Sequence, residues 1–153
     1  MNDESIDAAM REAERAVRGE AEYVTFELPL VPGEPFMFDP YDGEEPHGEP
    51  KRILAAIRAH LELGPAARDG ARPHVWAYYE DIQAQCDGQA LEDRAPPAGE
   101  AEIWDHVSAG SMSVDAPDDG PVSLIVTANC TWDPEHALMM VWRDGTELVK
   151  VSG

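Results

Sequence analysis

The spacing of apolar residues changes near residue 100, and this change most restricts the folds open to the chain. Before it, apolar side chains recur every three or four residues, as on one face of a helix. After it, they fall in short runs of β-type residues separated by turn residues. Helices followed by adjacent strands predict an α+β fold with the helices on one face of the sheet.

Three segments have helical spacing: residues 5–19, 50–64 and 73–86. Asp3 or Ser5 can cap the first helix, and Gly19 can end it. Pro73 favours the start of the third helix, because proline is tolerated in the first turn. This interpretation leaves residues 65–70 as a linker. We expect two or three of these helices to pack on the sheet.

Short β-type runs supply the strands of the predicted sheet. One lies early, at Tyr23–Leu30, and the others are Ile103–Val107, Ser111–Val114, Val122–Cys130, Leu138–Trp142 and Glu147–Val151. In the run Val122–Cys130, even-numbered residues should share one face, with Ile125 and Thr127 on the other. Asp133-Pro134 suits a type I turn, and Asp144-Gly145 is typical of a two-residue hairpin. The expected C-terminal sheet is therefore an antiparallel meander.

The chain of 153 residues is long enough for one domain with its own core. We interpret residues 1–153 as a single domain. Residues 1–100 form a helix-rich part with one strand and an acidic loop, and residues 101–153 form the antiparallel strands.

The charge is strongly acidic, with 31 Asp and Glu against 11 Lys and Arg and a formal net charge of -20. Such a field repels polyanions, which argues against direct nucleic-acid binding, and it attracts a basic protein in a salt-dependent way. No apolar segment of signal-peptide or membrane-spanning type is present, so we expect a cytoplasmic protein with no membrane association. Cys86 and Cys130 have no metal-type spacing and are interpreted as small buried hydrophobes.

Residues 31–50 are rich in Pro, Gly and acidic residues, which predicts a long loop with one short strand at most. Aromatic residues among carboxylates suit a protein-binding surface, because the rings supply contact energy and the charges steer the encounter. The predicted partner surface consists of Phe36, Phe38, Asp39, Tyr41, Asp42, Glu44 and Glu45.

The C-terminal third contains two segments, Ile103-Trp104-Asp105-His106-Val107 and Cys130-Thr131-Trp132-Asp133-Pro134-Glu135-His136-Ala137-Leu138. In these residues the chain resembles a family of uncharacterised bacterial proteins. The second segment is similar to the family motif Cys-x-Trp-Asp/Glu-x-Glu-His-Gly-Leu. Tyr78-Tyr79 is similar to a Tyr-Tyr pair on a helix that precedes this motif in the family. The resemblance covers residues 50–151. Ala137 stands where the family has Gly, and alanine adopts a backbone conformation with positive φ less readily than glycine does. The resemblance implies no established activity and at most an interaction or immunity-type role.

Two interpretations of the predicted hairpin at Cys130–Leu138 remain open. In the structural one, Asp133 caps its own turn, Trp132 packs, and Cys130 is an inert buried thiol. In the catalytic one, a divalent metal or acid–base site is formed by Asp105, His106, Glu135 and His136. The sequence contains no nucleophile elbow, phosphate-binding loop or zincin motif, and we expect no cofactor.

Three functions follow from these patterns. The preferred one is a non-enzymatic acidic binding protein, of immunity or inhibitor type, that binds a basic protein partner. The second is a metal-dependent, hydrolase-like enzyme. The third is DNA mimicry, with carboxylates in place of phosphates. No pattern indicates the oligomeric state.

Overall fold

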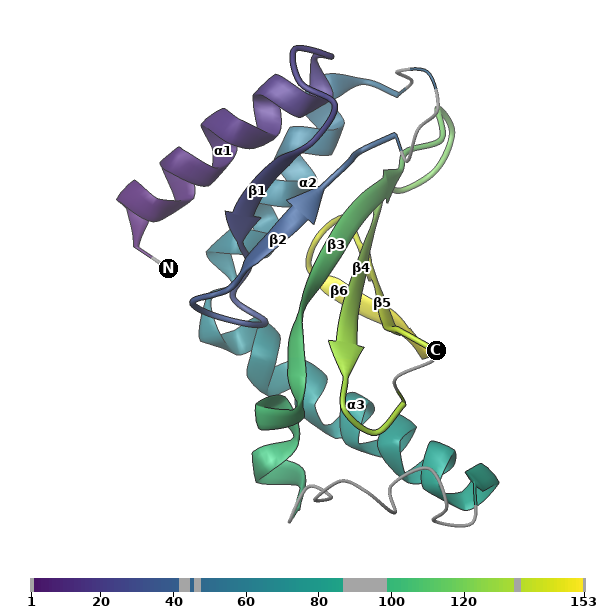
Figure 1. Ribbon diagram of the computed structural model, residues 1–153. Coiled ribbons are helices and arrows are strands. Elements are labelled where there is room, and N and C mark those ends of the chain that lie inside the picture. Colours follow the sequence, from purple (N-terminus) through teal and green to yellow (C-terminus); the bar gives the residue numbers. More distant parts are fainter. Residues whose placement is uncertain (1, 42–44, 46–47, 87–98, 134–135, 153) are drawn as a thin grey trace.

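The computed structural model describes residues 2–41, 45, 48–86, 99–133 and 136–152. The first part of the chain holds the helices and one β-hairpin, and a run of four strands follows, which confirms the α+β prediction (Figure 1). The elements are α1 (Asp3–Val17), β1 (Val24–Glu27), β2 (Pro35–Phe38), α2 (Pro50–Glu62), α3 (Pro65–Cys86), the 3₁₀ helix η2 (Glu100–His106), β3 (Val107–Asp115), β4 (Ser123–Cys130), β5 (Leu138–Arg143) and β6 (Glu147–Ser152).

The described strands form one six-stranded sheet in the order β1-β2-β3-β4-β5-β6. Strands β3 to β6 pair antiparallel in sequence order, as the predicted meander requires. The β1–β2 hairpin joins this meander through a parallel pairing of β2 with β3. The helix-rich part and the strand part of the chain therefore share one sheet.

One face of the sheet packs against the helices. Burial alternates along β4, where Leu124, Val126 and Ala128 are buried and Ile125 and Thr127 are half-exposed, as predicted. In Figure 1, α2 passes behind β1 and β2, and α1 packs on both α2 and β1. The buried face of the sheet and the apolar stripes of the helices thus form the core.

The first helix begins and ends with local hydrogen bonds. The N-cap is Asn2, one residue before the predicted Asp3, and its side-chain oxygen accepts a bond from Ser5 N at 2.8 Å. The C-terminal stop at Gly19 is confirmed. Gly19 has φ +78°, and the amides of Gly19 and Glu20 bond back to carbonyls in the last turn, which forms a Schellman motif.

The third helix begins earlier than predicted. Residues 65–70 form its first turns, and Pro73 lies inside it. Pro65 takes the first-turn position that suits proline. Pro73 cannot donate to the carbonyl of Asp69, but the fully buried Ala71 and Val75 hold the helix on the core across this missing bond.

The run Ile103–Val107 is also not a strand. Residues 100–106 form η2, and only Val107 belongs to β3. Ile103 and Trp104 are both buried, which two successive residues of a half-exposed strand cannot be. Trp104 donates its indole N–H to Arg68 O at 3.2 Å and so fixes η2 against α3.

The β5–β6 turn is centred on Asp144-Gly145, as predicted, but Arg143 pairs with Glu147, so the connection has three residues and not two. Thr146 N donates to Arg143 O at 3.1 Å across the turn. Asp144 has φ +51° and Gly145 has φ +83°, as a type I′ turn needs. Gly145 O lies 2.9 Å from His60 Nδ1, so the turn packs on α2. None of the described helices combines the length and apolar character needed to cross a membrane.

Candidate functional site

The aromatic residues of the predicted partner surface lie in the core, which corrects the prediction. Phe36 and Phe38 are fully buried, because β2 lies between β1 and β3 and its alternate side chains face the helices. The ring of Phe38 contacts Phe26 edge-on at 5.6 Å. Tyr41 is also buried and donates its hydroxyl to Val17 O at 2.5 Å. These rings stabilise the fold and cannot act as exposed anchors.

The acidic residues of that surface differ in environment. Asp39 is half-buried, and one of its carboxylate oxygens accepts a bond from Tyr41 N at 3.3 Å. Glu45 is exposed. Asp42 and Glu44 lie outside the described residues.

A second acidic segment lies beside this loop. The turn between β3 and β4 contains exposed Asp118 and Asp119, and a Cβ atom added at Gly48 in the loop would lie 3.2 Å from the Cβ of Ala116 at the start of this turn. Arg52 in the first turn of α2 also holds the turn, because its guanidinium donates to Gly120 O and, at 2.8 Å, to Pro117 O. The two segments therefore form one surface.

We call this surface the acidic end. Its described members are Asp39, Glu45, Glu49, Asp115, Asp118 and Asp119. Sequence reasoning missed the contribution of the β3–β4 turn. A usable signal was present, because residues 95–142 contain no Lys or Arg.

The residues proposed for a catalytic or metal site have separate partners. His106 Nδ1 lies 2.9 Å from Thr131 Oγ1, whereas His136 Nδ1 lies 3.2 Å from Asp133 Oδ1. Asp105 is exposed on η2, and Glu135 lies outside the described residues. Within the described ranges, no three His, Cys, Asp or Glu side chains are grouped so that they could hold a metal ion.

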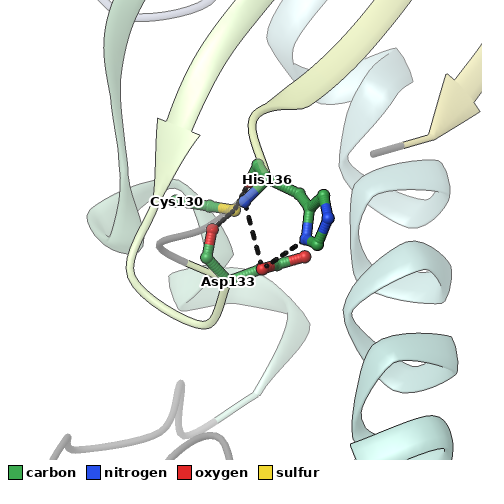
Figure 2. A network of polar contacts seen from close by, with 3 residues as sticks. All are labelled: Cys130, Asp133 and His136. Carbon is green, nitrogen blue, oxygen red and sulfur yellow. Dashed lines mark hydrogen bonds and ion pairs between the residues drawn. The ribbon is translucent and has the colours of Figure 1, made fainter.

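The hairpin between β4 and β5 is organised around Asp133 (Figure 2). Its carboxylate accepts bonds from the backbone N–H and from the ring of His136, each at 3.2 Å. The first of these bonds caps the turn, as the structural interpretation predicts. Among the described residues, only Asp144 and glycines have positive φ, so Ala137 does not need the conformation that glycine favours.

The thiol of Cys130 is not activated. Among the described residues, its sulfur makes weak contacts to carbonyl oxygens, at 3.8 Å from Asp133 and 4.0 Å from His136. Burial raises the pKa of Cys130 to about 11, with a smaller contribution from the Asp133 carboxylate, and a backbone hydrogen bond only partly offsets this. A protonated thiol is a poor nucleophile. The geometry therefore agrees with an inert buried cysteine.

An aromatic cluster joins this hairpin to α3. Trp132 is fully buried, with its ring 5.6 Å from Tyr79 and 6.4 Å from Tyr78. Burial, followed by the charges of Cys130 and Asp133, raises the pKa of Tyr78 to about 12. The Tyr78 hydroxyl and the Trp132 indole N–H have no hydrogen-bond partner among the described residues.

Residues 15–153 match the family described as a domain of unknown function, DUF6985. The chain belongs to this family. Comparisons with curated proteins and with solved structures found no match.

The match to DUF6985 extends beyond the 50–151 segment of the resemblance. It begins in the last turn of α1 and includes all six described strands, the acidic end and the β4–β5 hairpin. The expectation of a family without an assigned activity is confirmed.

Proposed function

We propose that this protein is a non-enzymatic acidic binding protein of the cytoplasm, of immunity or inhibitor type, which neutralises a basic protein partner. The acidic end carries the proposal. It collects carboxylates from two segments distant in sequence onto one surface, in a chain with a formal net charge of -20.

The placement of the cations supports this choice of surface. Several arginines form ion pairs elsewhere: Arg15 with Glu12, Arg18 with Glu14, Arg58 with Asp7, Arg72 with Asp69 and Arg143 with Glu147. Arg52 lies at the acidic end, but its guanidinium is bonded to backbone carbonyls. Lys51 is the nearby exposed cation. Carboxylates therefore dominate the local charge, and such a field accelerates encounter with a basic surface.

The hairpin gives less support to the enzymatic alternative. Nucleophilic catalysis by Cys130 would need a base within hydrogen-bond reach of its thiol. The ring of His136 bonds to Asp133, and among the described residues the Cys130 sulfur contacts carbonyl oxygens.

The test is a pull-down from lysate of the native host at low and high salt, with bound proteins identified by mass spectrometry. Two charge-reversed proteins are compared with wild type. Asp118→Lys with Asp119→Lys changes the acidic end. Glu100→Lys with Glu102→Lys changes the total charge equally on η2, at the opposite end of β3. All four side chains are exposed, so both variants should fold.

We expect one basic protein, captured at low salt and released at high salt, because exposed charges are screened within about 8 Å at physiological ionic strength. The acidic-end variant should lose this protein, and the η2 variant should retain it. Equal loss in both variants would assign binding to net charge alone and reject the acidic end. Absence of a salt-sensitive protein partner would reject the proposal. A captured DNA-binding protein that DNA displaces would favour mimicry.

A further inference from the structure

A groove of about 300 Å³ lies between α3 and β6. Its α3 side consists of His74, Ala77, Tyr78 and Asp81, which share one helical stripe through their spacing of three and four residues. Its β6 side consists of the consecutive residues Leu148–Val151. The groove contains no residue of the acidic end and is independent of the proposed function.

The strand side of the groove is the edge of the described sheet. β6 pairs with β5 on one side and is the last strand in the sheet order. An edge strand presents backbone N–H and C=O groups that another extended chain can pair with. A strand edge facing a helix is a geometry that admits a peptide by strand addition.

The residues that line the groove can make both apolar and charged contacts with a bound peptide. Val149 is 42% exposed and is one of the few large hydrophobic residues on the described surface. Tyr78 is nine-tenths buried, and its hydroxyl has no partner among the described residues. Asp81 and Lys150 are exposed and form no ion pair with another described residue.

We propose that this groove binds an extended segment of a partner protein, which pairs with β6 as an additional strand. An apolar side chain of the segment fills the space beside Tyr78, and a neighbouring basic residue pairs with Asp81. A partner segment fits better than a second copy of this chain. Two copies, each with a formal net charge of -20, would repel one another.

The test uses a phage-displayed library of random linear peptides, selected on the full-length protein. Binding of the selected peptides is then measured to wild type and to two variants. Ala77→Trp places a large ring in the groove at an exposed helical position. Ala55→Trp makes the same change at an exposed position of α2 outside the groove and serves as the matched control.

We expect the selected peptides to contain an apolar residue next to Lys or Arg. They should bind to Ala77→Trp at least about tenfold more weakly than to wild type, and to Ala55→Trp as strongly as to wild type. Amide hydrogen exchange within residues 147–152 should slow when the peptide is bound, because strand addition protects edge amides. Selected peptides that bind both variants equally, or leave β6 exchange unchanged, would overturn the proposal. A wild-type dimer that Ala77→Trp dissociates would assign the groove to a second copy instead. Failure of the acidic-end test would not affect these results.

Discussion

Replacing Gly145 with alanine tests the packing of the β5–β6 turn on α2. A Cβ atom at this position would lie 2.0 Å from Ala56 O and 3.2 Å from His60 N, both of which are backbone atoms of a helix. The residue also has φ +83°, which alanine rarely adopts. Neither neighbour can move without a shift of α2, so the turn must move away from the helix.

The expected loss of folding free energy in Gly145→Ala has three parts. The left-handed conformation costs alanine about 1–2 kcal/mol. Overpacking against a fixed backbone costs about 1–3 kcal/mol. The shift also weakens the bond between Gly145 O and His60 Nδ1, which contributes about 1 kcal/mol. A total of about 3–6 kcal/mol is large against a folding free energy on the order of 10 kcal/mol.

Urea unfolding, followed by circular dichroism, measures this loss. The urea midpoint should fall by about a third to three-fifths with little change in slope. Gly19→Ala is the matched control, since Gly19 has φ +78° but no atom within 4 Å of the added Cβ. It should show only the conformational cost. If the two variants lose the same stability, the close approach of the turn to α2 is wrong.

Two further predictions follow from pKa values. Burial lowers the pKa of His60 to about 4 from its ordinary 6.5, so the unfolded chain binds this proton more readily than the folded one. Folding stability should therefore decrease as the pH falls from 6.5 toward 4, by up to roughly 3 kcal/mol, and His60→Phe should remove this part of the dependence in urea melts at matched pH. Burial raises the pKa of Cys130 to about 11, so in a Cys86→Ser background its thiol should react with a disulfide reagent at about pH 8 some hundredfold more slowly when folded than in urea. Equal rates in the two states would contradict the buried thiol.

The C-terminal strands could be predicted because their signals are local. Alternation of apolar residues identifies β4, and Asp144-Gly145 identifies the turn that pairs β5 with β6. Each meander strand pairs with its sequence neighbour, so strand identity alone gives most of this topology.

The errors arose where distant segments decide the structure. The segments paired in parallel as β2 and β3 are separated in sequence by α2, α3 and η2, and this pairing places Phe36 and Phe38 in the core. A Pro- and Gly-rich loop containing aromatic residues has no local signal for that neighbour. Pro73 was interpreted as a helix start, but tertiary packing of α3 outweighs one missing backbone bond.

The two proposed surfaces required the structure for the same reason. The acidic end combines the segment after β2 with the β3–β4 turn, which approach each other at Gly48 and Ala116. The groove combines an α3 stripe that contains polar residues with the edge of the last strand. Charge counting could identify the first surface, but no sequence pattern indicates the second.

The two surfaces would contribute differently to one binding event. Exposed carboxylates act at a distance and mainly change the association rate, which salt reduces. A peptide paired with β6 is held by short-range contacts, which mainly set the dissociation rate. If one basic partner uses both surfaces, reversing the charges of Asp118 and Asp119 should slow association. Ala77→Trp should accelerate dissociation and leave the salt dependence of binding unchanged. If different partners use them, each variant affects both rates of one partner only, and this separation makes kinetics more informative than affinity alone.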